Sequence, residues 1–193
     1  SYFGIVDLAG FPKDVYYLYQ SEWTDKQVLH LFPHWNWTSG QEIDMWCYYN
    51  QADEVELFVN GKSQGVKCKD ADNLHVVWRV KFEPGTVKVV ARRKDEVIAE
   101  KEIRTAGKPA EIRLIPDRSV LAADGKDLCF VTVEVLDEEG NLCPNADNLV
   151  NFTVRGNGFI AGVDNGNPVS LERFKDKKRK AFYGKCLVVI QND

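Results

Sequence analysis

Alternation of apolar and polar side chains along residues 43–103 is the feature that most restricts the fold of this sequence. From Ile43 to Tyr49 every odd position is apolar or aromatic, and from Leu74 to Phe82 every even position is apolar. A period of two places such side chains on one face of a β-strand, whereas a helix would scatter them around its axis. The sequence therefore predicts antiparallel sheets that bury one face and expose the other.

Turn residues divide this region into short strands. Asn60-Gly61 follows the apolar run 55–59 and is the strongest short hairpin signal, because both residues tolerate a positive φ. Pro84-Gly85 and Lys94-Asp95 mark two further turns, the second of them before a strand over residues 97–103. About seven short strands with turns every eight to twelve residues are typical of an antiparallel β-sandwich.

A second β region follows an interruption of the pattern at residues 105–109 (TAGKP), which predicts a linker. A sandwich that begins at Ala110 and reaches only the apolar run 181–190 is expected to lack its last strand, which leaves residues 185–190 as an exposed apolar edge. We therefore predict an all-β chain with two tandem sandwiches, over residues 26–105 and 106–193. The strands expected in the second sandwich are residues 110–115, 128–136, 150–155, 159–163 and 181–190.

The first 25 residues differ from the rest because they carry a helical pattern. Pro12 suits a helix entry, and the spacing of the apolar residues places one set on a single face of a helix: Val15, Leu18, Tyr19 and Trp23. One amphipathic helix cannot form a core by itself. We expect it to pack on the first sandwich or on a neighbouring copy of the chain.

Counts of a few residue types narrow the class of protein. Met45 is the only methionine and lies well inside the chain, so we interpret the chain as a piece of a longer protein. The five cysteines form no C-x-x-C pair, which predicts free, mostly buried thiols. A net charge of −4 gives no basic footprint for nucleic acid, and no apolar run is long enough to insert into a membrane.

A search for the motifs of known chemistry yields no catalytic, cofactor-binding or metal-ligating residue. The sequence has no H-E-x-x-H, no G-x-S-x-G and no glycine-rich phosphate loop. The run 164–167 (DNGN) lacks the spaced acids of a calcium loop, so a plain turn is the better interpretation. The basic run 175–180 (KDKKRK) is interpreted as a solvated loop.

Aromatic residues are concentrated in the run FPHWNW, which ends at Trp37. Exposed tryptophans stack on the apolar faces of sugars, since each is a flat apolar body with a polar edge. Packing in a core or at a domain interface is the simpler explanation, because Trp is highly buried on average. The candidate residues for contact with a sugar or with another domain are Phe32, His34, Trp35 and Trp37.

Four stretches of the sequence resemble bacterial glycoside hydrolases of family 2. SYFGIVDLAGFPKDVYYLYQSEW is similar to the end of the family's catalytic (β/α)8 barrel, where F-G-I-x-D-x-x-G-F-P-K-D-x-x-Y-L-Y-x-S-x-W leads into the last helix. HLFPHWNWTSG and DMWCYYNQADEVELFVNGKSQG resemble the opening of an immunoglobulin-like domain. The sequence from TAGKPAEIRLIPDR onward looks like a second such domain. The resemblance covers essentially the whole chain and points to the β-galactosidase-like branch.

The resemblance implies two tandem immunoglobulin-like antiparallel β-sandwiches, preceded over residues 1–25 by a short helical remnant of the barrel. It also implies a parent enzyme that hydrolyses terminal β-galactosides or related β-glycosides with retention and without a cofactor. In the family, the acid/base glutamate follows an asparagine, and this chain has no Asn-Glu pair. The family's nucleophile glutamate lies in the barrel, upstream of the residues that this chain matches. We therefore expect a non-catalytic accessory region, inactive alone, from a periplasmic or secreted bacterial enzyme.

Two other functions remain open at this point. A free-standing carbohydrate-binding or adhesive module would use the aromatic residues, whereas an independent enzyme would need a pair of carboxylates that the sequence does not single out. The expected partners are the catalytic barrel of the parent, a carbohydrate, and a second copy of the chain that meets its exposed ends. Nucleic acid and membrane insertion are not expected.

Overall fold

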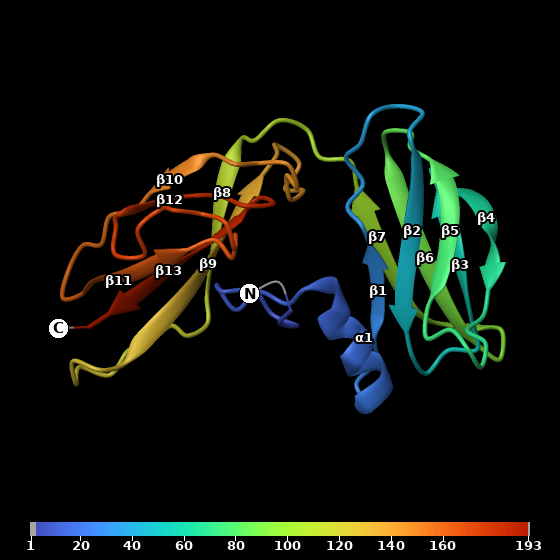
Figure 1. Ribbon diagram of the computed structural model, residues 1–193, viewed down its shortest axis with the longest axis horizontal. Helices are drawn as coiled ribbons and strands as arrows, with labels where there is room; N and C mark the ends of the chain where they lie inside the picture. Colours follow the sequence, from blue (N-terminus) through green and yellow to red (C-terminus); the bar gives the residue numbers. More distant parts are fainter. Residues whose placement is uncertain (1–2, 193) are drawn as a thin grey trace. The chain divides into compact units, whose positions relative to one another are not determined.

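The computed structural model describes residues 3–192, so that the ends of the predicted segments, residues 1, 2 and 193, lie outside it. The described chain forms two compact units (Figure 1). One comprises residues 12–105, and the other comprises residues 106–192 together with residues 3–11. All strand pairs in both units are antiparallel, which confirms the predicted all-β fold class.

The unit of residues 12–105, called the first sandwich, contains a three-stranded and a four-stranded sheet. Their strand orders are β1-β2-β5 and β4-β3-β6-β7, which is the arrangement of an immunoglobulin-like sandwich. The strands are β1 (Leu29–Phe32), β2 (Glu42–Tyr49), β3 (Glu54–Val59), β4 (Lys62–Lys67), β5 (Val76–Lys81), β6 (Thr86–Arg93) and β7 (Glu96–Arg104).

The core of the first sandwich contains the side chains that the alternation placed on one face of each strand. Met45 and Cys47 of β2 are 0% exposed, as are Val55 and Leu57 of β3. Trp35, also 0% exposed, belongs to this core, and its Nε1 donates a 3.1 Å hydrogen bond to the Glu83 carbonyl oxygen. All five tryptophans of the chain lie in this unit.

The predicted hairpin turns are present and have the expected backbone. Asn60 has φ 48° and Gly61 has φ 77°, so both adopt the left-handed region that this turn requires. Asn60 Oδ1 also accepts a 2.8 Å hydrogen bond from the Thr86 N–H, which ties the hairpin to β6. Lys94 and Asp95 form the second turn with φ 50° and 66°.

The other unit, called the second sandwich, has a four-stranded sheet of order β11-β13-β9-β8 and a small sheet of β10 and β12. Its core joins apolar side chains of β9, β10, β11 and β13. The strands are β8 (Glu111–Pro116), β9 (Leu128–Leu136), β10 (Leu149–Asn151), β11 (Phe159–Asp164), β12 (Lys178–Lys180) and β13 (Lys185–Gln191).

The second sandwich departs from the sequence predictions at two places. The strand expected over residues 150–155 is only the three residues of β10, and the last strand begins at Lys185 rather than at residue 181. The interpretation of the basic run as a solvated loop is wrong, because residues 178–180 pair with β10 and Arg179 is 1% exposed. One basic side chain thus points inward between two that face solvent, as a strand dictates.

The inner face of the four-stranded sheet is only partly covered. Near β13 it packs into the core, but at β8 Ile112 and Leu114 are 52% and 59% exposed. Both face the same side as Val133 and Val135 of β9, their register partners. Two three-residue strands are too small to cover a four-stranded sheet, so its β8 edge remains open. The expected exposed edge at residues 185–190 is wrong, because β13 lies between β11 and β9 and is paired on both sides. A further strand for this sandwich stays a prediction.

Candidate functional site

Six rings line the outer surface of the three-stranded sheet in the first sandwich. His30 and Phe32 of β1 lie opposite Tyr48 and Trp46 of β2, so their side chains share one face of the sheet. His75, which precedes β5, stacks on Trp46 with ring centroids 4.5 Å apart. We call the set Tyr17, His30, Phe32, Trp46, Tyr48 and His75 the aromatic face.

Contacts between neighbouring rings make the aromatic face continuous. Tyr17 stacks on His30 at 3.9 Å, and Phe32 meets Tyr48 at 4.8 Å and Trp46 at 6.3 Å between centroids. All these rings are half-buried. Such an array can pack against another domain or stack on a sugar ring, and it carries polar tips that can form hydrogen bonds.

Helix α1 (Asp14–Trp23) lies against one end of the aromatic face and contributes Tyr17 to it. Asp14 Oδ1 is 2.8 Å from His30 Nε2, and Glu22 near the other end of the helix pairs with Lys69 at 2.7 Å. The expectation that this helix packs on the first sandwich is confirmed. Among residues 3–192 no helix is long and apolar enough to span a bilayer.

Asn50 fixes the chain that leaves α1. Its Nδ2 donates to the carbonyl oxygens of Lys26 at 2.8 Å and Ser21 at 3.3 Å, while its Oδ1 accepts from the Val28 N–H at 2.8 Å. One side chain at the end of β2 thereby satisfies backbone groups in the last turn of the helix and in the segment after it. This arrangement sets where α1 lies on the sheet.

Burial changes the ionisation of the aromatic face. Desolvation raises the pKa of Tyr17 above its ordinary value, and the neighbouring Tyr16 and Asp14 raise it further. Desolvation and Asp14 raise the pKa of Tyr48 in the same way. Both phenols are therefore neutral hydroxyls at physiological pH and can act as hydrogen-bond donors.

The four predicted contact residues do not form one site. Phe32 belongs to the aromatic face, whereas His34 and Trp37 stack on each other at 4.4 Å in the loop after β1. Burial lowers the pKa of His34, and the Trp37 Nε1 donates to the His34 carbonyl oxygen at 2.7 Å. Trp35 points into the core, so its ring offers no surface to a sugar or another domain.

The other members of the aromatic face were not among the sequence candidates. Their signal is weak, because His30, Trp46 and His75 are distant in sequence and only the sheet register brings them together. Once β1 is known to pair with β2, the signal can be found, because aromatic residues occupy the outward positions 30 and 32 of β1 and 46 and 48 of β2. No group of three or more His, Cys, Asp or Glu side chains within residues 3–192 is arranged to hold a metal ion.

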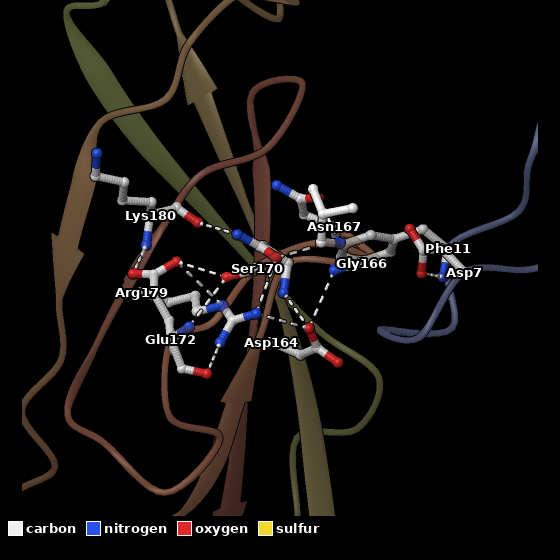
Figure 2. A network of polar contacts seen from close by, with 11 residues as sticks. Asp7, Phe11, Asp164, Gly166, Asn167, Ser170, Glu172, Arg179 and Lys180 are labelled. Carbon is white, nitrogen blue, oxygen red and sulfur yellow. Dashed lines mark hydrogen bonds and ion pairs between the residues drawn. The ribbon is translucent and has the colours of Figure 1, made fainter. Parts of the chain in front are cut away.

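The second sandwich contains a buried polar network around Arg179 (Figure 2). Its Nη2 donates to Asn165 Oδ1 at 3.0 Å and Asp164 Oδ1 at 3.3 Å, and its Nη1 donates to the Glu172 carbonyl oxygen at 3.1 Å. Asp164 Oδ1 also accepts from the N–H groups of Asn165 and Gly166. The run 164–167 is therefore a turn closed by its own side chains and held by a guanidinium.

Two family models match the two sandwiches separately. Residues 112–193 match the model described as glycoside hydrolase family 2 C-terminal domain 5, and residues 40–99 match a domain of unknown function, DUF4982. The fold and these matches define the class as tandem immunoglobulin-like domains of a glycosidase. The chain belongs to glycoside hydrolase family 2, within the C-terminal region of its members.

Similar curated proteins are much longer than this chain. Beta-galactosidase BoGH2A of Bacteroides ovatus is 90% identical over 193 residues, which are 100% of this chain and 23% of that protein. A putative beta-glucuronidase of Formosa agariphila is 37% identical over 199 residues, covering 97% of this chain and 19% of its own length. The chain thus spans about a quarter or less of these relatives.

Solved structures share the fold of the whole chain. A beta-glycosidase from Bacteroides vulgatus superposes with a TM-score of 0.93 at 35% identity, over 99% of this chain and 25% of its own. A family 2 member from Bacteroides cellulosilyticus gives 0.90 at 34% identity, over 98% of this chain and 28% of its own. The predicted immunoglobulin-like fold is confirmed.

Proposed function

We propose that this chain is a non-catalytic accessory part of a β-galactosidase-type enzyme, in which the first sandwich supports the catalytic barrel. The observation that carries the proposal is the docking of α1, the segment that resembles the last barrel helix, on the aromatic face. Contacts at Asp14, Tyr17 and Glu22 fix the helix along its length. The 90% identity to a protein named beta-galactosidase supports a galactoside as the substrate of the parent.

The geometry of the aromatic face suits contact with a neighbouring domain rather than catalysis. The half-buried rings of the aromatic face continue beyond Tyr17 to Trp46 and His75, so they offer a surface that a neighbouring domain can cover. Complete burial of an exposed Phe side chain contributes about 1.5–3 kcal/mol, so covering these half-buried rings contributes a fraction of that for each side chain. A barrel seated there would have its last helix fixed from outside, and the position of that helix affects the cleft that the barrel encloses.

Deletion of residues 26–193 from the longer polypeptide tests this proposal. We expect kcat/KM for 4-nitrophenyl β-galactoside to fall about tenfold or more, because a slight displacement of barrel elements misplaces the catalytic groups. The isolated chain is expected to show no hydrolysis. Full activity and an unchanged melting temperature after the deletion would exclude the accessory role. If the longer enzyme hydrolysed only another glycoside, the proposed substrate would be wrong and the accessory role could still be tested with that glycoside.

A second candidate function is sugar binding by the aromatic face, which its half-buried rings and polar tips favour. Calorimetric titration of the chain with galactosides is expected to give weak heats that disappear in Trp46→Ala. The variant Val66→Ala, at an exposed apolar position of β4, is the matched control. A flat isotherm at millimolar ligand would exclude this function and leave the accessory role as the only one supported.

A further inference from the structure

Residues 3–11 belong to the second sandwich by their contacts, although α1 directly after them belongs to the first. Residues 7–11 form a turn that Asp7 closes through its main chain and its side chain. The Asp7 N–H donates to the Phe11 carbonyl oxygen at 3.0 Å, its carbonyl oxygen accepts from Gly10 at 3.2 Å, and its Oδ1 accepts from the Phe11 N–H at 2.9 Å. The turn is therefore a preformed unit with the carboxylate at its centre.

This turn lies against Gly166 in the run 164–167 (Figure 2). A Cβ atom at Gly166 would overlap the Asp7 carboxylate, so the two segments touch with no room for a side chain between them. Gly166 has φ +74°, a conformation that also favours glycine. On the other side of the turn, Lys185 Nζ lies 6.0 Å from the centroid of the Phe11 ring, within reach of a cation–π contact.

The shape of the run 164–167 is set by its own side chains and by Arg179. Asp164 Oδ1 fixes the Gly166 N–H at 3.1 Å, and Asn165 Oδ1 fixes the Asn167 N–H at 3.0 Å. Arg179 holds both of these oxygens from inside the sandwich. Lys185 is in turn oriented by Glu134, whose Oε1 is 3.1 Å from its Nζ.

We propose that the run 164–167 and Lys185 form a docking site for the turn of residues 7–11, with Gly166 as the contact and Arg179 as a positioning residue. The N-terminal part of the chain then has two anchors. The turn of residues 7–11 is held by the second sandwich, and α1 is held by the first. The docking stands on the contacts alone. Its role as a second anchor for the catalytic barrel rests on the proposed function.

Gly166→Ala in the full chain tests the docking. We expect amide exchange in residues 3–11 to rise about tenfold or more, because the added methyl group displaces the turn and frees its hydrogen bonds. The matched control is Gly140→Ala in the same sandwich. Gly140 has φ +79° and no atom within 4 Å of the point that a Cβ would occupy, so it suffers the same backbone strain without the overlap. Equal exchange in the two variants would overturn the proposal.

A double substitution separates docking from misfolding of the turn at 164–167. Asp7→Ala removes the carboxylate that a methyl group at Gly166 would meet, so Gly166→Ala is expected to destabilise the second sandwich less in that background. Additive losses would contradict a direct contact. Arg179→Lys is expected to raise exchange in residues 3–11 as well, and Arg173→Lys, at an exposed position ahead of β12, is not. Kinetics of the longer enzyme test the anchoring role independently of these results.

Discussion

Trp35→Ala is expected to lower the free energy of unfolding of the first sandwich by about 3–5 kcal/mol. The ring is completely buried and meets Phe82 edge-on at 5.0 Å between centroids, so its removal leaves a large cavity. The Glu83 carbonyl oxygen also loses the hydrogen bond from Nε1. Two costs therefore add at one position.

The loss can be measured by urea-dependent labelling of Cys47, which is 0% exposed in the same core. Burial raises the pKa of this thiol to about 12, so it reacts only when the sandwich opens. Trp37→Ala is the control, because this half-buried ring packs only partly against the core and is expected to cost about 1 kcal/mol. Equal losses for the two variants would contradict the assignment of Trp35 to the core.

Arg179→Met is expected to destabilise the second sandwich by about 3–5 kcal/mol. Methionine replaces the apolar stem of the arginine, but it ends short of the guanidinium position and leaves Asp164 and Asn165 without their shared donor. Removal of one partner from a buried ion pair costs more than the pair contributes, because the remaining charge stays desolvated. The turn at residues 164–167 is expected to loosen first.

Labelling of Cys186, 0% exposed in the core of the second sandwich, reports this change. Burial raises the pKa of its thiol to about 12, and the exposed Cys68 serves as an internal reference that reacts at once. Arg173→Met, at an exposed position six residues earlier, is expected to change stability by less than about 0.5 kcal/mol. If Arg179→Met changed stability as little as this control, the polar network around Arg179 would not contribute to the stability of the second sandwich.

Local pattern was sufficient for most strands and for the hairpins. Alternation along β2 and β5 identified the buried face, and Asn60-Gly61 located a turn whose φ values require those residue types. The helix was predictable from its spacing. These features depend on residues close in sequence, which is why one sequence was enough to find them.

Features that depend on pairing over long distances were not predictable. The basic run gave no sign that Arg179 points inward, because its partners Asp164 and Asn165 lie some fifteen residues earlier, at the end of a different strand. The run FPHWNW suggested one contact site, yet Trp35 turns into the core while Phe32 stays on the surface. The register of β1 with β2 decides which rings meet, and no single segment encodes it.

Because all five tryptophans lie in the first sandwich, tryptophan fluorescence reports on the unfolding of that unit alone. Indole emission will follow that sandwich and remain silent while the second one unfolds, since residues 106–193 contain no tryptophan and a single tyrosine, Tyr183. A melting curve recorded by fluorescence alone would describe half of the protein. Far-ultraviolet circular dichroism detects the strands of both units. Comparison of its melting curve with the fluorescence curve would show whether the two sandwiches unfold together or one after the other.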